Sequence, residues 1–220
     1  MNLLIVLAHP NPNAFSRAVA ERLARGWTDL DGHTVEIADL AREGFDPRMG
    51  EQDLAAYRGE MAPPESIFQE QRRVDRADAL AFVFPVYWWS MPALLKGWID
   101  RVFTAGWAYG VDPVGKAWRR LANRPTHLLA VSGADLPSFE KYGYDTAMIA
   151  QIERGIFHFC GIRSVQTHLL VSAEKADGVN RAAHLEAAYG LGHTISAQLQ
   201  AAAGGPAAGT PHPALAPGSQ

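Results

Sequence analysis

The sequence predicts an α/β domain built on a five-stranded parallel sheet with helices on both faces. Short apolar runs rich in branched residues alternate along the chain with segments of helical periodicity. Most of these runs are continuously apolar, which is typical of strands whose two faces are both covered. With 220 residues, of which 48% are hydrophobic and 20% charged, the chain is long enough to bury a core without disulfides or metals.

The first part of the chain is expected to form a βαβ unit. NLLIVLA, at residues 2–8, predicts a buried strand, and the apolar spacing over residues 14–27 predicts a helix. HTVEIADL, at residues 33–40, alternates and predicts the second strand. Residues 41–64 are polar, carry Gly and Pro and have only a weak helical patch at residues 53–57. We expect this segment to be a long excursion, and such loops are often functional.

The remaining chain continues the alternation. Apolar runs predict strands over residues 79–85, 126–131 and 164–171. Helical spacing predicts helices over residues 66–76, 92–103, 145–159 and 179–199, with Pro92 at the first position of its helix. The five strands suit a flavodoxin-like order. We interpret residues 1–200 as one domain and residues 201–220, rich in Ala, Gly and Pro without periodicity, as a disordered tail.

Composition argues against several classes of partner. The net charge of -3 gives no electrostatic reason to expect binding to nucleic acid or to an anionic membrane. Cys160 is the only cysteine, so the chain has no internal disulfide, and a reducing compartment fits. The apolar run near the N-terminus, Leu3–Ala8, is too short for a signal peptide or a membrane span. We therefore expect a cytoplasmic protein without membrane insertion.

A ligand is expected at the carboxyl ends of the strands, where the connecting loops of an open α/β sheet diverge. This rule selects the loops at residues 9–16, 86–91 and 132–144. The first loop, HPNPNAFS, is neither a Gly-x-Gly-x-x-Gly turn nor a P-loop. Asn13 and Ser16 can still donate beside the free amides of a helix N-terminus, which suits a phosphate. The loop alone favours the simpler interpretation that one of these two side chains caps the helix.

The second loop carries three consecutive aromatic residues, Tyr87, Trp88 and Trp89. No helix or strand can bury three neighbouring side chains on one face, whereas a planar ligand can contact them. The third loop, SGADLPSFEKYGY, offers a turn of small residues together with Phe139, Tyr142 and Tyr144. A phosphate-binding loop beside two aromatic or small-residue loops favours a flavin over a sugar phosphate.

Three stretches then carry a family resemblance: LIVLAHPNPNAFSRA, FPVYWWSMPALLKGWIDRVFTAGWAYG and GIFHFCGI. Together they closely resemble the NAD(P)H:quinone oxidoreductase (DT-diaphorase) family of flavodoxin-like flavoproteins, over about residues 1–200. Ancillary reductases of bacterial potassium-efflux systems and modulator-of-drug-activity proteins are relatives of this family. The resemblance implies a homodimer whose active site lies at the subunit interface.

The resemblance also implies a set of cofactor-binding residues. On the phosphate and ribityl side of the flavin these would be His9, Asn13, Phe15, Ser16 and Ala18. Along the isoalloxazine edge they would be Pro85, Val86, Tyr87, Trp88 and Trp89. Ser132, Gly133 and Ala134 match a Thr-Gly-Gly type turn, and Arg181 would face the adenine if the cofactor is FAD. Backbone amides of residues 86–89 and 132–134 are expected to stabilise negative charge on the reduced ring.

Three residues are implied in catalysis. Tyr109, in GWAYG, aligns with an active-site tyrosine supplied across the dimer interface, and Trp89, which would line the isoalloxazine edge, is the second. Tyr142 falls at or near the family's active-site histidine, and Val111 replaces a second family tyrosine. His158 and Cys160 match the family's HFCG motif, but we interpret them as a packed core pair.

The implied reaction is a ping-pong two-electron reduction of quinones by NAD(P)H, with FAD as the cofactor and FMN as the alternative. A nicotinamide passes hydride to the flavin and leaves, and a quinone then takes its place. Two other functions stay open: an azo or nitro reductase, and a redox-sensing regulatory subunit of a potassium-efflux system. A one-electron flavodoxin is disfavoured by the long Trp98–Tyr109 stretch and by the lack of a strongly acidic surface.

Overall fold

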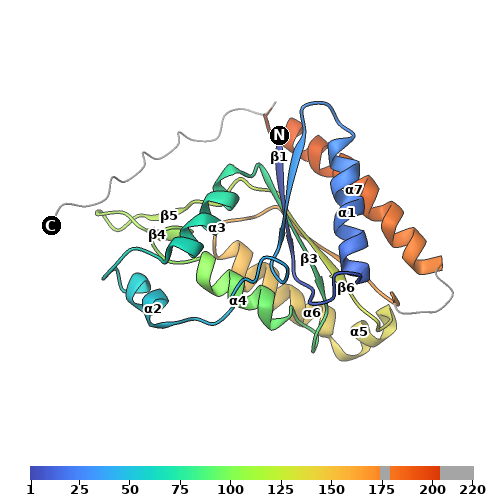
Figure 1. Cartoon of the computed structure of the whole chain (residues 1–220), viewed down its shortest axis with the longest axis horizontal. Coiled ribbons are helices and arrows are strands. Elements are labelled where there is room, and N and C mark those ends of the chain that lie inside the picture. The colour runs from blue at the N-terminus through green and yellow to red at the C-terminus, as the bar shows by residue number, and fades with distance from the viewer. Residues whose placement is uncertain (174–178, 204–220) are drawn as a thin grey trace.

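Five parallel strands form the central sheet of the computed structural model, which describes residues 1–173 and 179–203 (Figure 1). The strands are β1 (Asn2–Leu7), β2 (Thr34–Asp39), β3 (Ala79–Pro85), β6 (Thr126–Val131) and β7 (Val165–Leu170). Their order is β2-β1-β3-β6-β7, with every pair parallel. The predicted parallel sheet and its flavodoxin-like order are confirmed, and the strand bounds agree with the sequence prediction to within one residue.

Helices cover both faces of this sheet (Figure 1). One face packs against α1 (Phe15–Thr28) and α7 (Val179–Ala203), and the other against α3 (Glu65–Arg76), α4 (Ala93–Val102) and the π-helical segment η1 (Ile149–His158). Shorter elements lie at the margins: α2 (Glu51–Tyr57), α5 (Leu136–Tyr142), α6 (Tyr144–Met148) and the hairpin of β4 (Tyr109–Val111) and β5 (Ala117–Arg119). Within the described ranges, no helix combines the length and the hydropathy that crossing a membrane requires.

The core explains why the strand signal is so clear. All seven residues of β3 are buried, because this central strand has neighbours on both sides and helices on both faces. On the α4 side, the Phe82 ring lies 5.9 Å from Trp98 and 5.2 Å from Phe157. On the α1 side, the fully buried Trp27 donates its indole N–H to the Thr34 carbonyl at 2.7 Å. The continuous apolar run in the sequence is therefore the signature of a strand buried on both faces.

Four details differ from the sequence prediction. Pro92 is the N-cap of α4 and precedes its first helical residue. The single helix expected over residues 145–159 divides into α6 and the π-helical η1. The helix α5 lies inside a segment expected to be a loop. Helix α7 continues to Ala203, so the first three residues of the predicted tail are helical, and residues 204–220 lie outside the described part of the chain.

The hairpin of β4 and β5 has no counterpart in the sequence prediction. Its strands have three residues each, too few for a periodic signal, and the turn supplies the order. Asp112 accepts the backbone N–H groups of Val114 and Lys116, and Gly115 takes a φ of 82°. A side chain that satisfies two turn amides therefore holds together strands that are too short to be recognised.

Helices α1 and α7 approach each other through two glycines. A Cβ added to Gly26 would collide with the backbone carbonyl of Tyr189, and one added to Gly192 would collide with the backbone of Gly26 and Trp27. Gly190, on an exposed part of α7, has no heavy atom within 4 Å of an added Cβ. The close approach of the two helices therefore requires glycine at positions 26 and 192, and does not require it at 190.

We predict opposite effects for two glycine substitutions. Gly26→Ala should lower the free energy of unfolding by about 1–3 kcal/mol, because the methyl group forces the two backbones apart. Gly190→Ala should raise it by about 0.5–1 kcal/mol, because alanine loses less conformational entropy in an exposed helix. Urea unfolding followed by circular dichroism measures both, and equal effects at the two positions would contradict the interpretation.

Candidate functional site

Three loops meet at one edge of the sheet because β1, β3 and β6 are neighbours and end together. Pairing continues just beyond the strands: the Ala8 amide donates to the Val83 carbonyl at 3.1 Å, and the Val86 amide to the Val131 carbonyl at 2.8 Å. The segments that follow, at residues 9–14, 86–91 and 132–135, therefore start side by side. This is the edge at which ligands bind in open α/β sheets.

The first loop leaves the N-terminus of α1 without a cap. Its N-cap residue is Ala14, which has no side-chain acceptor, and the amides of Phe15 and Ser16 find no acceptor among the described residues. The simpler interpretation, that Asn13 or Ser16 caps the helix, is therefore wrong. Asn11 organises the loop instead, because its Oδ1 accepts the Asn13 amide at 2.9 Å. A helix N-terminus with free amides is suited to an anion.

His9 borders this N-terminus and has a defined tautomer. Its Nδ1 accepts the backbone N–H of Asn11 at 3.0 Å, which leaves the proton on Nε2. Burial lowers the pKa of His9, whereas the hydrogen bond from Asn11 acts in the opposite direction. The ring is therefore neutral at pH 7 and can donate one hydrogen bond from Nε2.

The start of α7 adds a cationic and aromatic pair beside the same helix N-terminus. The Arg181 guanidinium lies 4.6 Å from the centroid of the Phe15 ring, a cation–π distance. His184 lies 6.5 Å from the same ring and donates from Nε2 to the Val171 carbonyl at 2.8 Å. Residues more than 160 positions apart in the sequence are thus brought together, and both Phe15 and Arg181 had been predicted to bind the cofactor.

The second loop is a tight turn with an unusual backbone. The Tyr87 amide donates to the Ser90 carbonyl at 3.0 Å and the Ser90 amide to the Tyr87 carbonyl at 3.1 Å. The two residues between them, Trp88 and Trp89, have φ values of 50° and 59°. Both central residues are therefore left-handed, as in a type I′ turn, where Asn or Gly is usual. For a bulky residue each such conformation costs about 1–3 kcal/mol, and strain of this kind is concentrated at functional sites.

This turn presents its two tryptophans differently. The Trp88 side chain is 93% exposed, whereas Trp89 is half-buried and stacks on Tyr144 at 3.8 Å between ring centroids, with an interplanar angle of 10°. Tyr142, which is 61% exposed, lies 5.5 Å from Tyr144 and so joins the same aromatic group. The predicted residues Trp88, Trp89 and Tyr142 are therefore brought together, and Trp88 presents an open aromatic surface at the sheet edge.

Fewer backbone amides are free than the sequence analysis expected. In the second loop the amides of Val86 and Tyr87 already have acceptors, which leaves those of Trp88 and Trp89 without one among the described residues. In the third loop the Ser132 amide donates to the Leu170 carbonyl at 3.0 Å and the Ala134 amide to the Ser132 Oγ at 3.1 Å. Of the seven backbone amides expected to face a ring, those of Trp88, Trp89 and Gly133 have no acceptor among the described residues and remain free to bind a ligand.

Tyr109 does not lie at this edge within its own chain. It belongs to the β4–β5 hairpin, which Figure 1 shows on the opposite side of the molecule from α5. Its ring contacts Phe159 edge-on at 4.9 Å, and Phe159 is 51% exposed. Burial raises the pKa of Tyr109, so the phenol keeps its proton at neutral pH.

The contacts of several residues at the sheet edge and beside Tyr109 could not be predicted from the sequence. Asn11 and Gln151 act through hydrogen bonds that have no sequence motif, and Tyr144 was noted only as a member of an aromatic loop. Phe159 belongs to the quoted HFCG motif, and its exposure beside Tyr109 could not be seen in the sequence. Cys160 is buried and its burial raises the pKa of the thiol to about 11, which supports the packing role, whereas His158 is only half-buried.

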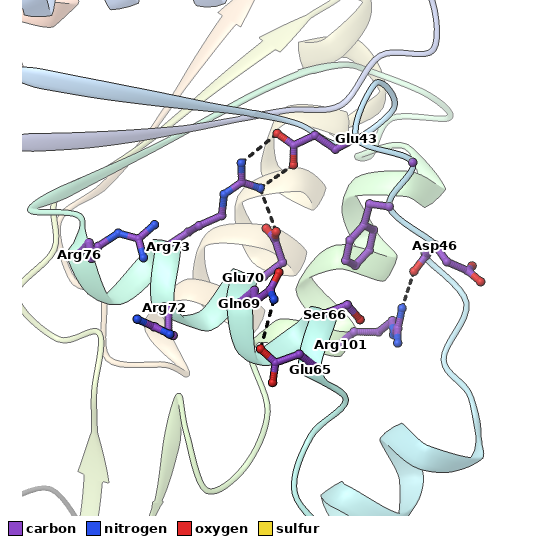
Figure 2. A pocket seen from close by; sticks show the side chains of 12 residues that line it. Glu43, Asp46, Glu65, Ser66, Gln69, Glu70, Arg72, Arg73, Arg76 and Arg101 are labelled. Carbon is purple, nitrogen blue, oxygen red and sulfur yellow. Dashed lines mark hydrogen bonds and ion pairs between the residues drawn. The ribbon is translucent and has the colours of Figure 1, made fainter.

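A separate charged groove of 770 Å³ lies along α3 (Figure 2). Its lining shares no residue with the three loops. Arg73 crosses it and forms ion pairs with Glu43 at 2.5 Å and with Glu70 at 2.9 Å, while Arg101 donates to the Asp46 carbonyl at 2.6 Å. Glu70 also accepts the Trp98 indole N–H at 2.8 Å. These side chains are paired with one another, and their ion pairs and hydrogen bonds hold α3 and α4 to the segment after β2. We therefore do not take this groove as the candidate site.

Comparison with known proteins agrees with this geometry. A family profile described as a flavodoxin-like fold matches residues 1–190. The chain belongs to the flavodoxin-like family. It is 31% identical to an uncharacterized NAD(P)H oxidoreductase of Haemophilus influenzae, over 86% of this chain and 92% of that protein. It is also 31% identical to a mouse ribosyldihydronicotinamide dehydrogenase (quinone), over 73% and 77% of the two chains.

A solved flavodoxin-like structure supports the same assignment. The NAD(P)H:quinone oxidoreductase from Methanothermobacter marburgensis superposes with a TM-score of 0.79 at 30% identity, covering 89% of this chain and 98% of that one. The predicted resemblance to the NAD(P)H:quinone oxidoreductases is therefore confirmed. In a flavodoxin-like sheet of this strand order the ligand site is the switch point between β1 and β3, where the first two loops lie.

We predict that glycine is better tolerated than alanine at position 88. Trp88 is left-handed and its side chain is exposed, so its replacement removes little packing. Trp88→Gly should be more stable than Trp88→Ala by roughly 0.5–1 kcal/mol, because alanine keeps the left-handed penalty that glycine avoids. At Glu140, exposed on α5, the same two substitutions should rank in the opposite order. Urea unfolding of the four variants tests this, and an identical order at both positions would contradict the turn geometry.

Proposed function

We propose that this chain is a flavin-dependent NAD(P)H:quinone oxidoreductase. One observation carries the proposal: an uncapped helix N-terminus and a left-handed aromatic turn, both with free amides, lie at the same edge of the sheet. The first suits a phosphate and the second suits the edge of a planar heteroaromatic ring. The relatives of the chain include NAD(P)H oxidoreductases and quinone dehydrogenases, which supports the same reaction.

The proposed cofactor is FAD. The amides of Phe15 and Ser16, together with the Nε2–H of His9, would hold the phosphates, and Ala18 lies one turn further along α1. The Phe15 ring with the Arg181 guanidinium over it offers a flat, cationic surface on which an adenine ring could stack. FMN, the alternative, would leave this platform unused, so the mass of the cofactor released by heat decides between the two.

The flavin, when bound, supplies the hydride chemistry that links a nicotinamide to a quinone. The chain's own part is to position the reactants and to stabilise charge. The free amides of Trp88 and Trp89 would donate to the ring edge, where negative charge develops on reduction. Trp88, with its exposed side chain, would form one wall of the place that nicotinamide and quinone occupy in turn.

The proposed active site is completed by a second copy of the chain. The half-buried Tyr109 and the exposed Phe159 lie on the side of the β4–β5 hairpin, where Tyr57, Val111 and Val114 are also exposed. An exposed apolar surface of this kind is typical of a protein interface. In a homodimer this surface would cover the partner's flavin, where the protonated Tyr109 hydroxyl can donate a hydrogen bond to the quinone oxygen, with Tyr142 at the rim.

The function is tested directly by reconstitution. The purified protein, loaded with FAD or FMN, should show a visible flavin band that bleaches on anaerobic addition of NAD(P)H and recovers when a quinone is added. Turnover with a panel of quinones and azo dyes identifies the preferred class of acceptor. A preparation that retains neither nucleotide, or whose bound flavin is not reduced by NAD(P)H, would exclude the proposal. The protein for this test can be expressed in the cytoplasm, which is its proposed location because its one thiol, Cys160, is free and buried.

We predict that capping α1 separates stability from cofactor binding. Ala14→Asp supplies the missing cap, so the apoprotein should gain about 0.5–2 kcal/mol in its free energy of unfolding. The same carboxylate occupies the free amides and repels a phosphate, so affinity for the flavin nucleotide should fall at least about tenfold. Ala14→Ser is the matched control, because it caps without charge. Calorimetric titration with FAD measures the affinity, and unchanged binding by Ala14→Asp would place the phosphate elsewhere.

We predict that Tyr109 acts on the partner's site. Tyr109→Ala and the double variant Ala14→Asp, Gly133→Asp, which is designed not to hold flavin, should each be poorly active alone. When the two are unfolded together and refolded, mixed dimers have one intact site, and random pairing should restore about a quarter of wild-type turnover. Mixing folded homodimers without exchange is the control. No recovery after verified exchange would mean that Tyr109 serves its own chain, and full activity of Tyr109→Ala alone would mean that it has no role.

A further inference from the structure

The left-handed turn at Trp88 and Trp89 needs something outside itself to hold it. Two hydrogen bonds between Tyr87 and Ser90 close the turn, but they do not oppose the steric preference of each tryptophan for a negative φ. Such conformations persist only where the surrounding structure fixes them. The question is therefore which contacts from other elements do so.

Three contacts reach the turn from the consecutive elements α5, α6 and η1. Tyr144, the first residue of α6, stacks on Trp89 at 3.8 Å with an interplanar angle of 10°, and Phe139 of α5 meets the same indole edge-on at 5.2 Å. The Ser90 hydroxyl donates to Gln151 Oε1 of η1 at 2.8 Å. The two ring contacts thus hold Trp89, the last left-handed residue, and the hydrogen bond holds Ser90, which closes the turn.

The chain places Tyr144 through a sharp corner. Gly143 takes a φ of 69° and ends α5 while starting α6, so the ring at position 144 turns back toward the second loop. The Tyr144 hydroxyl makes no hydrogen bond within the described residues, and the contact with Trp89 is made by the ring face. Tyr144 therefore contacts the turn through its aromatic ring, and its hydroxyl takes no part in that contact.

The geometry points to Tyr144 as a positioning residue of the redox site, with the bond between Gln151 and Ser90 as its second support. By stacking on Trp89, Tyr144 keeps residues 88 and 89 left-handed and so keeps their free amides at the sheet edge. The inference rests on the proposed function, because the consequence is a property of the bound flavin. Loss of the stack lets the turn relax, and the amides then no longer stabilise negative charge on the reduced ring.

The test compares Tyr144→Leu, which removes the ring, with Tyr144→Phe, which keeps it. We expect Tyr144→Leu to bind flavin at least about tenfold more weakly and to shift the flavin reduction potential to more negative values, because donors to the reduced form are lost. Tyr144→Phe should match the wild type in both. Phe157→Leu is the packing control: it also removes a ring contact from the core, and should lower Tm while leaving the potential unchanged.

The possible outcomes distinguish failure of this inference from failure of the proposed function. A Tyr144→Leu protein with lowered Tm but wild-type flavin affinity and potential would overturn the positioning role, because packing alone would explain Tyr144. If that variant does not fold, Gln151→Ala, at an exposed side chain, carries the test through a smaller shift of potential in the same direction, and an unchanged potential overturns the inference. Failure of the wild-type protein to bind or reduce any flavin would instead exclude the proposed function.

Discussion

Parallel pairing of β1, β3 and β6 is the constraint on which the rest of the molecule depends. Their backbone groups are satisfied by neighbouring strands and both faces are covered by helices, so these three strands leave donors free only where they end. Because the three strands are neighbours and run the same way, their ends lie at one edge. The helix N-terminus after β1, the turn after β3 and the small-residue loop after β6 are therefore gathered without any direct bond among them.

At this edge of the sheet, two local features destabilise the fold and leave backbone amides free. After β1 the chain omits a helix cap, placing Ala14 where a polar side chain would stabilise the helix, and so leaves two amides available to an anion. After β3 it places two tryptophans in a left-handed turn that glycine would adopt without strain. Both choices weaken the isolated fold, and both leave donors free at a place where a phosphate and a heteroaromatic ring fit. Locally unfavourable choices of this kind are expected at functional sites.

The strands and the position of the ligand loops could be predicted from the sequence, because apolar periodicity and motifs indicate them. The buried β3, with all seven residues inside, gives an unbroken apolar run, and the three ligand loops follow from the parallel order. The sequence could not reveal which amides are free: those of Val86 and Ser132 extend the sheet by one further bond, and that of Ala134 meets the Ser132 hydroxyl, which is a matter of local geometry. It also missed the β4–β5 hairpin, whose order comes from the Asp112 turn, and the stack of Tyr144 on Trp89, which joins residues 55 positions apart.

The distribution of aromatic residues is the reason for proposing that two copies of the chain form the site together. Trp88, Trp89, Tyr142 and Tyr144 gather at the strand ends, whereas Tyr109 and Phe159 form a second aromatic pair on a distant side. The first group leaves the Trp88 side chain almost fully in solvent, so the proposed flavin site is open on one side within a single chain. The second group consists of the exposed Phe159 ring and the half-buried, protonated Tyr109, which contact each other at 4.9 Å. Two copies related by a twofold axis would bring each group to the other, and so would enclose two identical sites with one interface.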